Sequence, residues 1–283
     1  MTTVAQALRE AAASLAATSD TARLDAELLM AEALGVSRSE LILRRAGDAV
    51  PPSFAALVAR RASHEPVAYI LGRQEFRGLE LIVNSAVLIP RGDSEVVVEA
   101  ALRACPAPAR VLDCGTGSGA LLLAVLNETG AAGVGIDRSL GALAVAAANA
   151  ARLGLSARAR MLCRDWHAPG WAADLGRFDL VLANPPYVES GAALFPSVRA
   201  HEPAGALFAG ADGLDDYRVL IPQLAGLLAP GGTAVIEIGA AQGDAVTHLA
   251  LACGFAASLH RDLGGRPRAL VLENSLGNRP RSR

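Results

Sequence analysis

Apolar residues recur at helical spacing through the first quarter of the chain. The stretch from Leu24 to Ala31 follows this pattern, and Gly35 comes where a left-handed turn can end the helix. Pro51 and Pro52 suit the first turn of a further helix that runs to about Ser63. The pattern predicts a small bundle of helices over residues 1–72, with one apolar stripe per helix.

Two short polar motifs mark helix starts in the same region. Thr3 with Gln6, and Ser37 with Glu40, fit the capping box, in which side chain and backbone satisfy each other's unpaired groups. Helices are therefore expected to begin next to Thr3 and Ser37.

The apolar period changes over residues 73–90. Short β-prone runs are separated by turn signals at Gly78 and at Asn84-Ser85. This segment is predicted to be a β-hairpin or an extended linker, with Pro90 at the boundary to the next domain.

Strand and helix patterns alternate over residues 91–276. Strands are predicted at Arg110–Cys114, Gly133–Asp137, Ala159–Cys163, Phe178–Ala183, Thr233–Ile238, Ala257–Arg261 and Ala269–Glu273. Helices are predicted at Gly119–Glu128, through the alanine-rich stretch to about Leu153, at Leu214–Leu228 and at Gly243–Cys253. The alternation predicts an α/β fold with a doubly wound, mostly parallel seven-stranded sheet. Pro222 predicts a kink or break in its helix, and the tail, residues 277–283, is expected to be disordered.

Composition narrows the class of protein. The chain has 283 residues, 52% of them hydrophobic and 19% charged, as expected for a folded globular protein. No apolar run is long enough to span a bilayer, and the N-terminus lacks the features of a signal peptide. The protein is expected to be cytoplasmic, with no membrane association.

Charge and cysteine content bear on whether the protein binds nucleic acids or metal ions. The net charge is −2 and every basic side chain is an arginine, so composition lends no support to nucleic-acid binding, although a local patch is compatible with it. The four cysteines are scattered without metal-ligand spacing, so no metal site is predicted.

A glycine-rich turn, DCGTGSG, joins the first predicted strand of the sheet to the next helix. Its candidate ligand-binding residues are Asp113, Gly115, Thr116, Gly117, Ser118 and Gly119. Glycine lets the backbone approach a ligand, and a helix N-terminus offers free N–H groups; a tight structural turn is the alternative. Asp137 ends the next strand, where a carboxylate can accept hydrogen bonds from both ribose hydroxyls.

The glycine spacing does not decide the cofactor by itself. Ala120 stands where the dinucleotide motif G-x-G-x-x-G has its third glycine. The turn instead resembles those that bind S-adenosylmethionine, with Asp113 near the methionine end. Asp165 and Trp166 follow the third strand, where the carboxylate can accept the adenine amino group and the indole can pack on the ring. A place in the core is the alternative for Trp166.

The stretch FDLVLANPPY, ending at Tyr187, indicates the chemistry of the acceptor. Asn184 offers a side-chain carbonyl to an N–H, and Pro185 and Pro186 stiffen the turn so that the Pro185 carbonyl can be a second acceptor. Tyr187 supplies a flat face for a planar group. A planar amide or amine beside a methyl donor predicts methyl transfer to nitrogen.

With these motifs the chain resembles the release-factor glutamine N5-methyltransferase family, the HemK/PrmC type, over nearly its whole length. The resemblance also rests on RLDAELLMAEALG (Arg23–Gly35), EPVAYILGRQEFRG (Glu65–Gly78), VLIPRGDSEVVVE (Val87–Glu99), HEPAGALFAGADGL (His201–Leu214) and IEIGAAQ (Ile236–Gln242). It implies a class I S-adenosylmethionine-dependent methyltransferase fold behind the helical domain, with S-adenosylhomocysteine as product.

The resemblance implies that the acceptor is the glutamine of the GGQ motif in class 1 peptide-chain release factors. Asn184 and the Pro185 carbonyl would take both amide hydrogens and aim the nitrogen at the methyl group. Residues 1–72 would recognise the protein substrate.

The segment before the methyltransferase domain departs from the family pattern. Arg91 and Glu95 are expected near the substrate, but Gly92 and Ser94 stand where proline and threonine are usual. The extra freedom of Gly92 bears on how rigidly Arg91 and Glu95 are held.

Other functions stay open on sequence alone. A ribosomal-protein glutamine N5-methyltransferase is the nearest alternative, and an adenine-N6 nucleic-acid methyltransferase shares NPPY. A release-factor-binding module without activity is a third, although it would not need intact donor glycines. The histidines are expected to pack or face solvent, and Asp215 and Asp216 to cap a helix.

Overall fold

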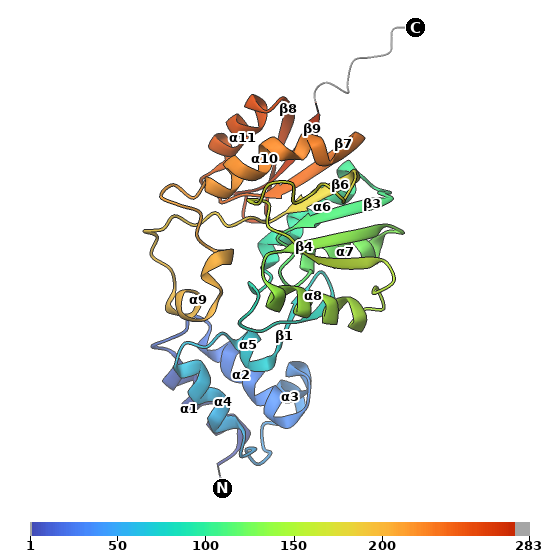
Figure 1. The fold of residues 1–283 in the computed structure, drawn as a ribbon. Coiled ribbons are helices and arrows are strands. Elements are labelled where there is room, and N and C mark those ends of the chain that lie inside the picture. The colour runs from blue at the N-terminus through green and yellow to red at the C-terminus, as the bar shows by residue number, and fades with distance from the viewer. Residues whose placement is uncertain (1, 275–283) are drawn as a thin grey trace. The chain divides into compact units, whose positions relative to one another are not determined.

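The structure is a computed structural model that describes residues 2–274. Contacts divide the chain into two compact units (Figure 1). The first unit runs to Arg73 and includes Leu194–Glu202, and the second comprises Gln74–Ala193 and the chain from Pro203 onward. The tail predicted to be disordered, 277–283, lies outside the described residues.

The first unit is helical. Its helices are α1 (Val4–Leu15), α2 (Ala22–Leu34), α3 (Arg38–Arg44), α4 (Phe54–Ala62), α5 (Val67–Leu71) and α9 (Pro196–His201). Apolar side chains from α1 to α5 share one core, in which Leu29 and Met30 are fully buried. A buried ion pair joins Asp25 of α2 to Arg61 of α4 at 2.6 Å.

The capping boxes form only by half. The Thr3 hydroxyl accepts from the N–H of Gln6 at 3.4 Å, and the Ser37 hydroxyl accepts from the N–H of Glu40 at 3.1 Å. The predicted helix starts are therefore confirmed. The return bonds are absent from the described hydrogen bonds, because the side chains of Gln6 and Glu40 pair instead with residues further along the chain.

Other details of this unit agree only in part with the sequence pattern. Gly35 ends α2 in the left-handed conformation, as predicted. Leu24 does not belong to the buried stripe, because it is 39% exposed. Pro51 and Pro52 lie before α4, which begins at Phe54, and not in its first turn.

The predicted hairpin is confirmed. Strands β1 (Arg73–Phe76) and β2 (Leu79–Ile82) pair with each other. Arg77 and Gly78 between them have φ angles of 49° and 74°, as a two-residue hairpin turn requires. Asn149 holds the hairpin within the second unit, since its amide exchanges hydrogen bonds of 2.6 and 3.0 Å with the last residue of β2.

The second unit is built on a seven-stranded sheet of order β5-β4-β3-β6-β7-β9-β8. The strands are β3 (Arg110–Cys114), β4 (Ala132–Asp137), β5 (Ala159–Cys163), β6 (Phe178–Ala183), β7 (Leu228–Glu237), β8 (Phe255–Arg261) and β9 (Pro267–Asn274). All neighbours from β5 to β7 are parallel, and β9 runs antiparallel to both β7 and β8. The mostly parallel sheet predicted from the sequence is confirmed.

Helices cover both faces of this sheet (Figure 1). Helices α6 (Glu95–Ala104), α7 (Ala120–Glu128) and α8 (Leu140–Arg152) pack on one face, and α10 (Asp215–Leu227) and α11 (Gly243–Ala252) pack on the other. Leu180 and Leu182 of β6 point into the first layer, and Val181 and Ala183 into the second. Burial on both faces explains why this strand is apolar without interruption from Leu180 to Ala183.

Several elements were not predicted. Helix α6 follows the short 3-10 helix η1 (Gly92–Ser94), and the segment expected to be a loop, 189–210, contains α9 and a second 3-10 helix, η2 (Ala204–Ala206). A kink or break was predicted at Pro222, but helix α10 continues through this residue without a break.

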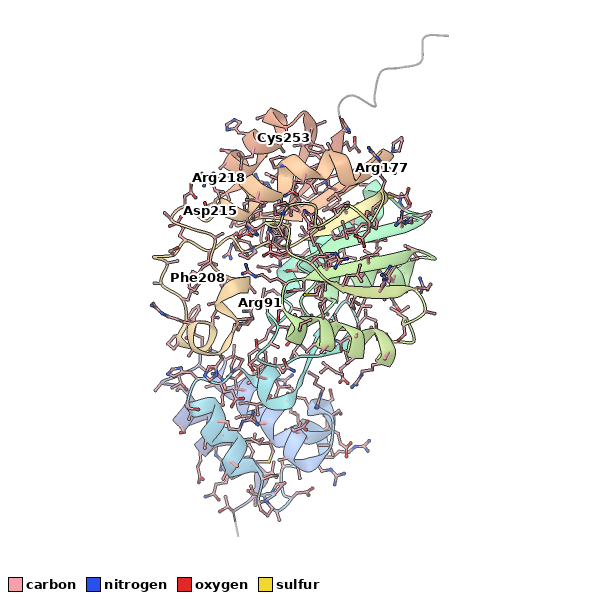
Figure 2. The ribbon with its side chains drawn as sticks, in the orientation of Figure 1. Arg91, Arg177, Phe208, Asp215, Arg218 and Cys253 are labelled. Carbon is pink, nitrogen blue, oxygen red and sulfur yellow. The ribbon has the colours of Figure 1, made fainter. Side chains whose placement is uncertain are left out.

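Asp215 and Asp216 do not cap α10, contrary to prediction. Leu214 is the N-cap residue and no side chain makes a cap hydrogen bond there. Asp215 instead accepts from Arg218 at 3.1 Å, and both lie at the start of the helix (Figure 2). Asp216 turns inward to a different partner, described below.

Within residues 2–274, no helix combines the length and the apolar character needed to cross a membrane.

Candidate active site

Three neighbouring strand ends bring the predicted residues together. In the register of the parallel strands, Cys114 of β3 pairs with Ile136 of β4 and with Ala183 of β6. The glycine turn, Asp137 and Asn184, which follow these residues, therefore lie at one edge of the sheet. They line a pocket within the second unit, and its predicted members are Arg91, Asp113, Gly115, Thr116, Gly117, Ser118, Asp137, Asp165, Trp166, Asn184 and Pro186.

The backbone of the glycine turn explains its composition. Gly115, Gly117 and Gly119 have φ angles of 75°, 54° and 85°, which side chains rarely adopt. A Cβ on Gly115 would lie 3.1 Å from the ring of Trp166, and one on Gly119 would lie 2.9 Å from Leu123. Gly115 thus permits a close approach across the pocket, whereas Gly119, outside the lining, permits the start of α7.

Asp137 is fixed by the backbone around it. Its Oδ2 accepts from the N–H of Gly117 at 3.0 Å, and its Oδ1 accepts from the N–H of Ser139 at 2.8 Å. Each oxygen keeps a lone pair for another donor. The carboxylate can therefore accept two neighbouring hydroxyl groups at once.

Asp113 is an unusual carboxyl group because it is only 1% exposed. The Thr116 hydroxyl donates to its Oδ2 at 2.7 Å, while its buried Oδ1 has no hydrogen-bond partner among the described residues. Burial raises the pKa of Asp113 to about 7. This residue therefore titrates near neutral pH.

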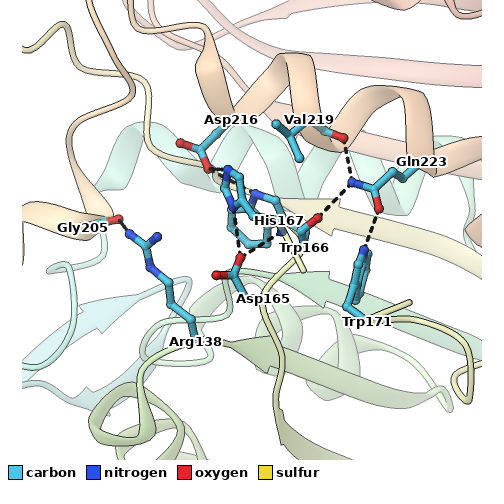
Figure 3. A network of polar contacts seen from close by, with 9 residues as sticks. All are labelled: Arg138, Asp165, Trp166, His167, Trp171, Gly205, Asp216, Val219 and Gln223. Carbon is cyan, nitrogen blue, oxygen red and sulfur yellow. Dashed lines mark hydrogen bonds and ion pairs between the residues drawn. The ribbon is translucent and has the colours of Figure 1, made fainter. Parts of the chain in front are cut away.

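Asp165 and Trp166 belong to a polar network that crosses from the β5 loop to α10 (Figure 3). Oδ1 of Asp165 accepts from the N–H of His167 at 2.9 Å and lies 3.0 Å from Nδ1 of its ring. The indole N–H of Trp166 donates to Asp216 at 3.1 Å, and the His167 ring lies 3.6 Å from the same oxygen. Figure 3 shows His167 between the two carboxylates.

The pKa values of the two carboxylates in this network shift in opposite directions. Burial alone would raise the pKa of Asp165, but hydrogen bonds from His167 outweigh it and lower that pKa. Burial raises the pKa of Asp216, which is 8% exposed. Asp216 anchors Trp166 by accepting from its indole N–H. Gln223 of α10 adds a second anchor, because its amide donates to the Trp166 carbonyl at 3.1 Å.

Asn184 leads the acceptor turn that follows β6. It is half-buried, and its side chain makes no hydrogen bond to any residue in the range 2–274. Pro185 and Pro186 are buried, and only Pro186 reaches the pocket lining. The amide of Asn184 is thus a polar group at the pocket whose hydrogen-bonding capacity is not used by the described residues.

Tyr187 faces a neighbouring cavity of the second unit. Its hydroxyl donates to Oε1 of Glu237 at 3.3 Å, and its carbonyl accepts from Gln242 at 3.1 Å. Burial, followed by the nearby Glu237, raises the pKa of Tyr187 to about 12. The phenol therefore stays protonated at neutral pH.

Of the residues predicted near the substrate around the start of α6, some line the pocket and others do not. Arg91 lines both the pocket and the neighbouring cavity, and Ser94 lines the pocket. Glu95 lines neither, because its carboxylate accepts the N–H of Arg77 in the hairpin turn at 3.2 Å. A Cβ on Gly92 would meet nothing within 4 Å, so the space there does not require glycine.

Comparison with known proteins identifies the family. Residues 6–72 match the PrmC N-terminal domain family, and residues 107–209 match a methyltransferase domain family. A release factor glutamine methyltransferase of Cereibacter sphaeroides is 44% identical over 273 residues, which cover 93% of this chain and 96% of the relative. The chain belongs to the release factor glutamine methyltransferase family. It is therefore a methyltransferase.

Further comparisons agree with this family and its fold. The release factor glutamine methyltransferase of Geobacter sulfurreducens is 43% identical over 244 residues, 83% of this chain and 84% of the relative. A solved structure, the ribosomal protein L11 methylase of Lactobacillus delbrueckii, superposes with a TM-score of 0.50 at 22% identity, covering 66% of this chain and 81% of that one. This likeness shows the shared methyltransferase fold.

Sequence reasoning missed some residues of this methyltransferase site. Arg138 donates to the carbonyl of Gly205 at 2.8 Å, and both line the pocket (Figure 3). Arg138 follows Asp137 at a strand end, which was an available signal. His167 and Asp216 gave none, because their partners are distant in sequence or fixed only by folding. Glu237 lies in the segment IEIGAAQ that carries part of the resemblance, but its partner was not evident from that segment.

Proposed function

We propose that this methyltransferase transfers a methyl group to the side-chain amide nitrogen of the GGQ glutamine in class 1 peptide-chain release factors. S-adenosylmethionine is the methyl donor. The observation that carries the proposal is the side-chain amide of Asn184, which lines the pocket and makes no hydrogen bond to any of the described residues. Family membership supports the choice of a release factor as the acceptor.

The pocket residues fit the donor group by group. Asp137 would accept the two ribose hydroxyls, since each of its oxygens has a free lone pair. Asp165 would accept the adenine amino group, because His167 uses only its Oδ1. Trp166 would pack on the adenine, and Asp113 and the glycine turn would hold the methionine end. When bound, the donor supplies an electrophilic methyl group.

The acceptor side addresses the weakness of an amide as a nucleophile. The nitrogen lone pair of an amide is delocalised into its carbonyl. If the Asn184 side-chain carbonyl and the Pro185 backbone carbonyl accept the two N–H hydrogens, they orient the nitrogen and stabilise the positive charge that develops on it. Tyr187 packs its ring against the planar amide.

The same arrangement gives specificity and removes the need for a base before attack. Methylation makes the nitrogen strongly acidic, so a proton leaves after the N–C bond has formed. A glutamate carboxylate has no N–H to donate and would face two acceptor oxygens. We therefore expect strong rejection of glutamate at the target position.

The helical unit is assigned to recognition of the whole release factor. A pocket for one side chain cannot distinguish a release factor from other proteins that display glutamine. Residues 1–72 are thus proposed as the recognition domain and residues 73–90 as the linker to the methyltransferase domain. Arg91, at the pocket, is proposed to contact the substrate backbone.

A transfer assay with labelled donor tests the proposal. Purified release factor should take up methyl label, whereas a GGQ glutamine-to-alanine release factor, a glutamine-bearing ribosomal protein and DNA should not. Asn184→Ala should lower kcat about 100-fold or more, because an acceptor aimed at the reacting group is lost. The matched control is Asn127→Ala, an exposed asparagine of α7, which should leave kcat unchanged.

Label on the ribosomal protein or on DNA, with none on the release factor, would overturn the proposed acceptor. An Asn184→Ala variant with full activity would overturn the assigned role of the turn even if the acceptor were right.

A further inference from the structure

Behind the acceptor turn lies a buried carboxyl group that the proposed chemistry does not use. Glu237 ends β7, and its predecessor Ile236 pairs with Ala183 of β6. Glu237 therefore lies beside Asn184, the first residue of the acceptor turn. It is 2% exposed, and its Oε2 has no hydrogen-bond partner among the described residues.

An incompletely paired buried carboxyl group costs stability, so its position calls for a reason. A polar or apolar residue of similar size would fill this strand end at less cost. Glu237 accepts from the Tyr187 hydroxyl at 3.3 Å, and it lines the same cavity as Arg91. Glu237 thus contacts the acceptor turn in a cavity that the segment carrying Arg91 also lines.

The charged and titratable groups around Glu237 come from every neighbouring element. Arg268 of β9 is buried and donates to Asp93 of η1 at 3.0 Å and to Asp262 at 3.3 Å. Tyr217 of α10 donates to the backbone carbonyl of Glu237 at 3.0 Å. Among the described residues, Tyr187 and Arg91 also face this end of β7.

Apart from its hydrogen bond to Glu237, the contacts of Tyr187 within residues 2–274 are made through its backbone and by packing. Its carbonyl accepts from Gln242, and a Cβ on Gly239 would lie 3.4 Å from its ring. Neither contact fixes the phenol hydroxyl. Among the described hydrogen bonds, the one to Glu237 alone engages that hydroxyl.

We propose that Glu237 is a positioning residue for the acceptor side of the active site: it holds the Tyr187 phenol from behind and so fixes the ring that packs on the substrate amide. The inference rests on the proposed function in naming the amide. Glu237 itself touches neither the substrate nor the donor. Its effect is therefore expected in the methyl-transfer step and absent from donor binding.

The kinetic test is a double-mutant cycle. Glu237→Ala should lower kcat about 10-fold with little change in the donor dissociation constant, and Glu237→Gln, which keeps an acceptor oxygen, should restore most of it. In a Tyr187→Phe background, Glu237→Ala should cause little further loss. Thr233→Val, a buried polar position on the same strand, serves as the control and should leave kcat unchanged.

A second measurement does not depend on activity. Burial raises the pKa of Glu237 to about 7, so the Tyr187 ring should sense its ionisation. The carbon-13 signal of the Tyr187 phenol should shift with a midpoint near that pH, and Glu237→Gln should abolish the shift. The chain has three tyrosines, so Tyr187→Phe assigns the signal.

These two readouts separate the inference from the proposed function. Additive losses in the cycle, or a Tyr187 signal that titrates unchanged in Glu237→Gln, would overturn the positioning role. A wild-type protein that fails to methylate release factor, while its Tyr187 signal follows Glu237 as described, would overturn the function and leave the contact standing.

Discussion

The N–H of Gly117 donates to the carboxylate of Asp137 at 3.0 Å. The turn after β3 is thereby fixed to the residue that ends β4, and both face the same pocket. A donor molecule that bridges the glycine turn and Asp137 meets a surface that is already organised. Preorganisation of this kind lowers the entropic cost of binding.

Replacing Gly115 should weaken donor binding selectively. Gly115→Ala puts a Cβ 3.1 Å from the Trp166 ring at a φ of 75°. The left-handed conformation alone costs about 1 kcal/mol for a side chain, and displacement of the indole adds to it. We expect donor affinity to fall about 10-fold or more by calorimetry. Gly130→Ala, which meets nothing within 4 Å, is the control and should bind normally.

Trp166 and Trp171 each donate an indole N–H to a side chain, but replacing them with phenylalanine should affect donor binding differently. Trp166→Phe removes the hydrogen bond to Asp216, and Trp171→Phe removes the one from Trp171 to Gln223. Each loss should cost about 1–2 kcal/mol in the free energy of unfolding. Only Trp166 lines the pocket, so only Trp166→Phe should also weaken donor binding. Equal donor affinities in the two variants would contradict this assignment.

The buried carboxyl of Asp113 should make stability depend on pH. Its pKa rises from 3.8 in the unfolded chain to about 7 in the folded protein. The folded state therefore keeps a proton that the unfolded state has released, and stability falls as pH rises through this window. The free energy of unfolding of Asp113→Asn, relative to that of wild type, should therefore increase by up to about 4 kcal/mol from acid to mildly alkaline pH.

Denaturant unfolding of both proteins across the window measures this gain. The exposed Asp244→Asn substitution in α11 is the control and should show no such trend. A constant difference between Asp113→Asn and wild type at all pH values would argue against a protonated Asp113.

Loss of Arg138 should speed donor release. Its hydrogen bond to the carbonyl of Gly205 holds the η2 segment at the rim of the pocket. Arg138→Ala removes one charge-assisted hydrogen bond, which corresponds to a several-fold faster dissociation rate. Stopped-flow measurement of donor release can test this, with Arg103→Ala, an exposed residue of α6, as the control.

The sequence predicted what depends on short-range pattern. The strand that ends at Cys114, its glycine turn and the NPPY turn after β6 lie as expected, because strand ends and turn residues are local signals. Long-range pairing left no such signal. Asp216 has the sequence position of a capping residue, and its bond to Trp166 arises only when α10 packs against the β5 loop.

Glu95 and Glu237 both show that residue spacing does not predict long-range contacts. Glu95 lies in a motif of the family, yet it does not line the pocket. Its carboxylate instead accepts from the N–H of Arg77 in the hairpin turn. Glu237 also lies in a segment that resembles the family, yet only the parallel register with β6 brings it behind Tyr187. Which strand lies next to which is a property of topology that residue spacing does not encode.

Tandem mass spectrometry of release factor after incubation with this protein and S-adenosylmethionine tests the central claim most directly. The account predicts one added methyl group on the side-chain nitrogen of the GGQ glutamine, and about 100-fold slower addition when Asn184→Ala replaces the wild-type enzyme at equal donor binding. A methyl group on any other residue, or an unmodified glutamine in the presence of bound donor, would contradict it.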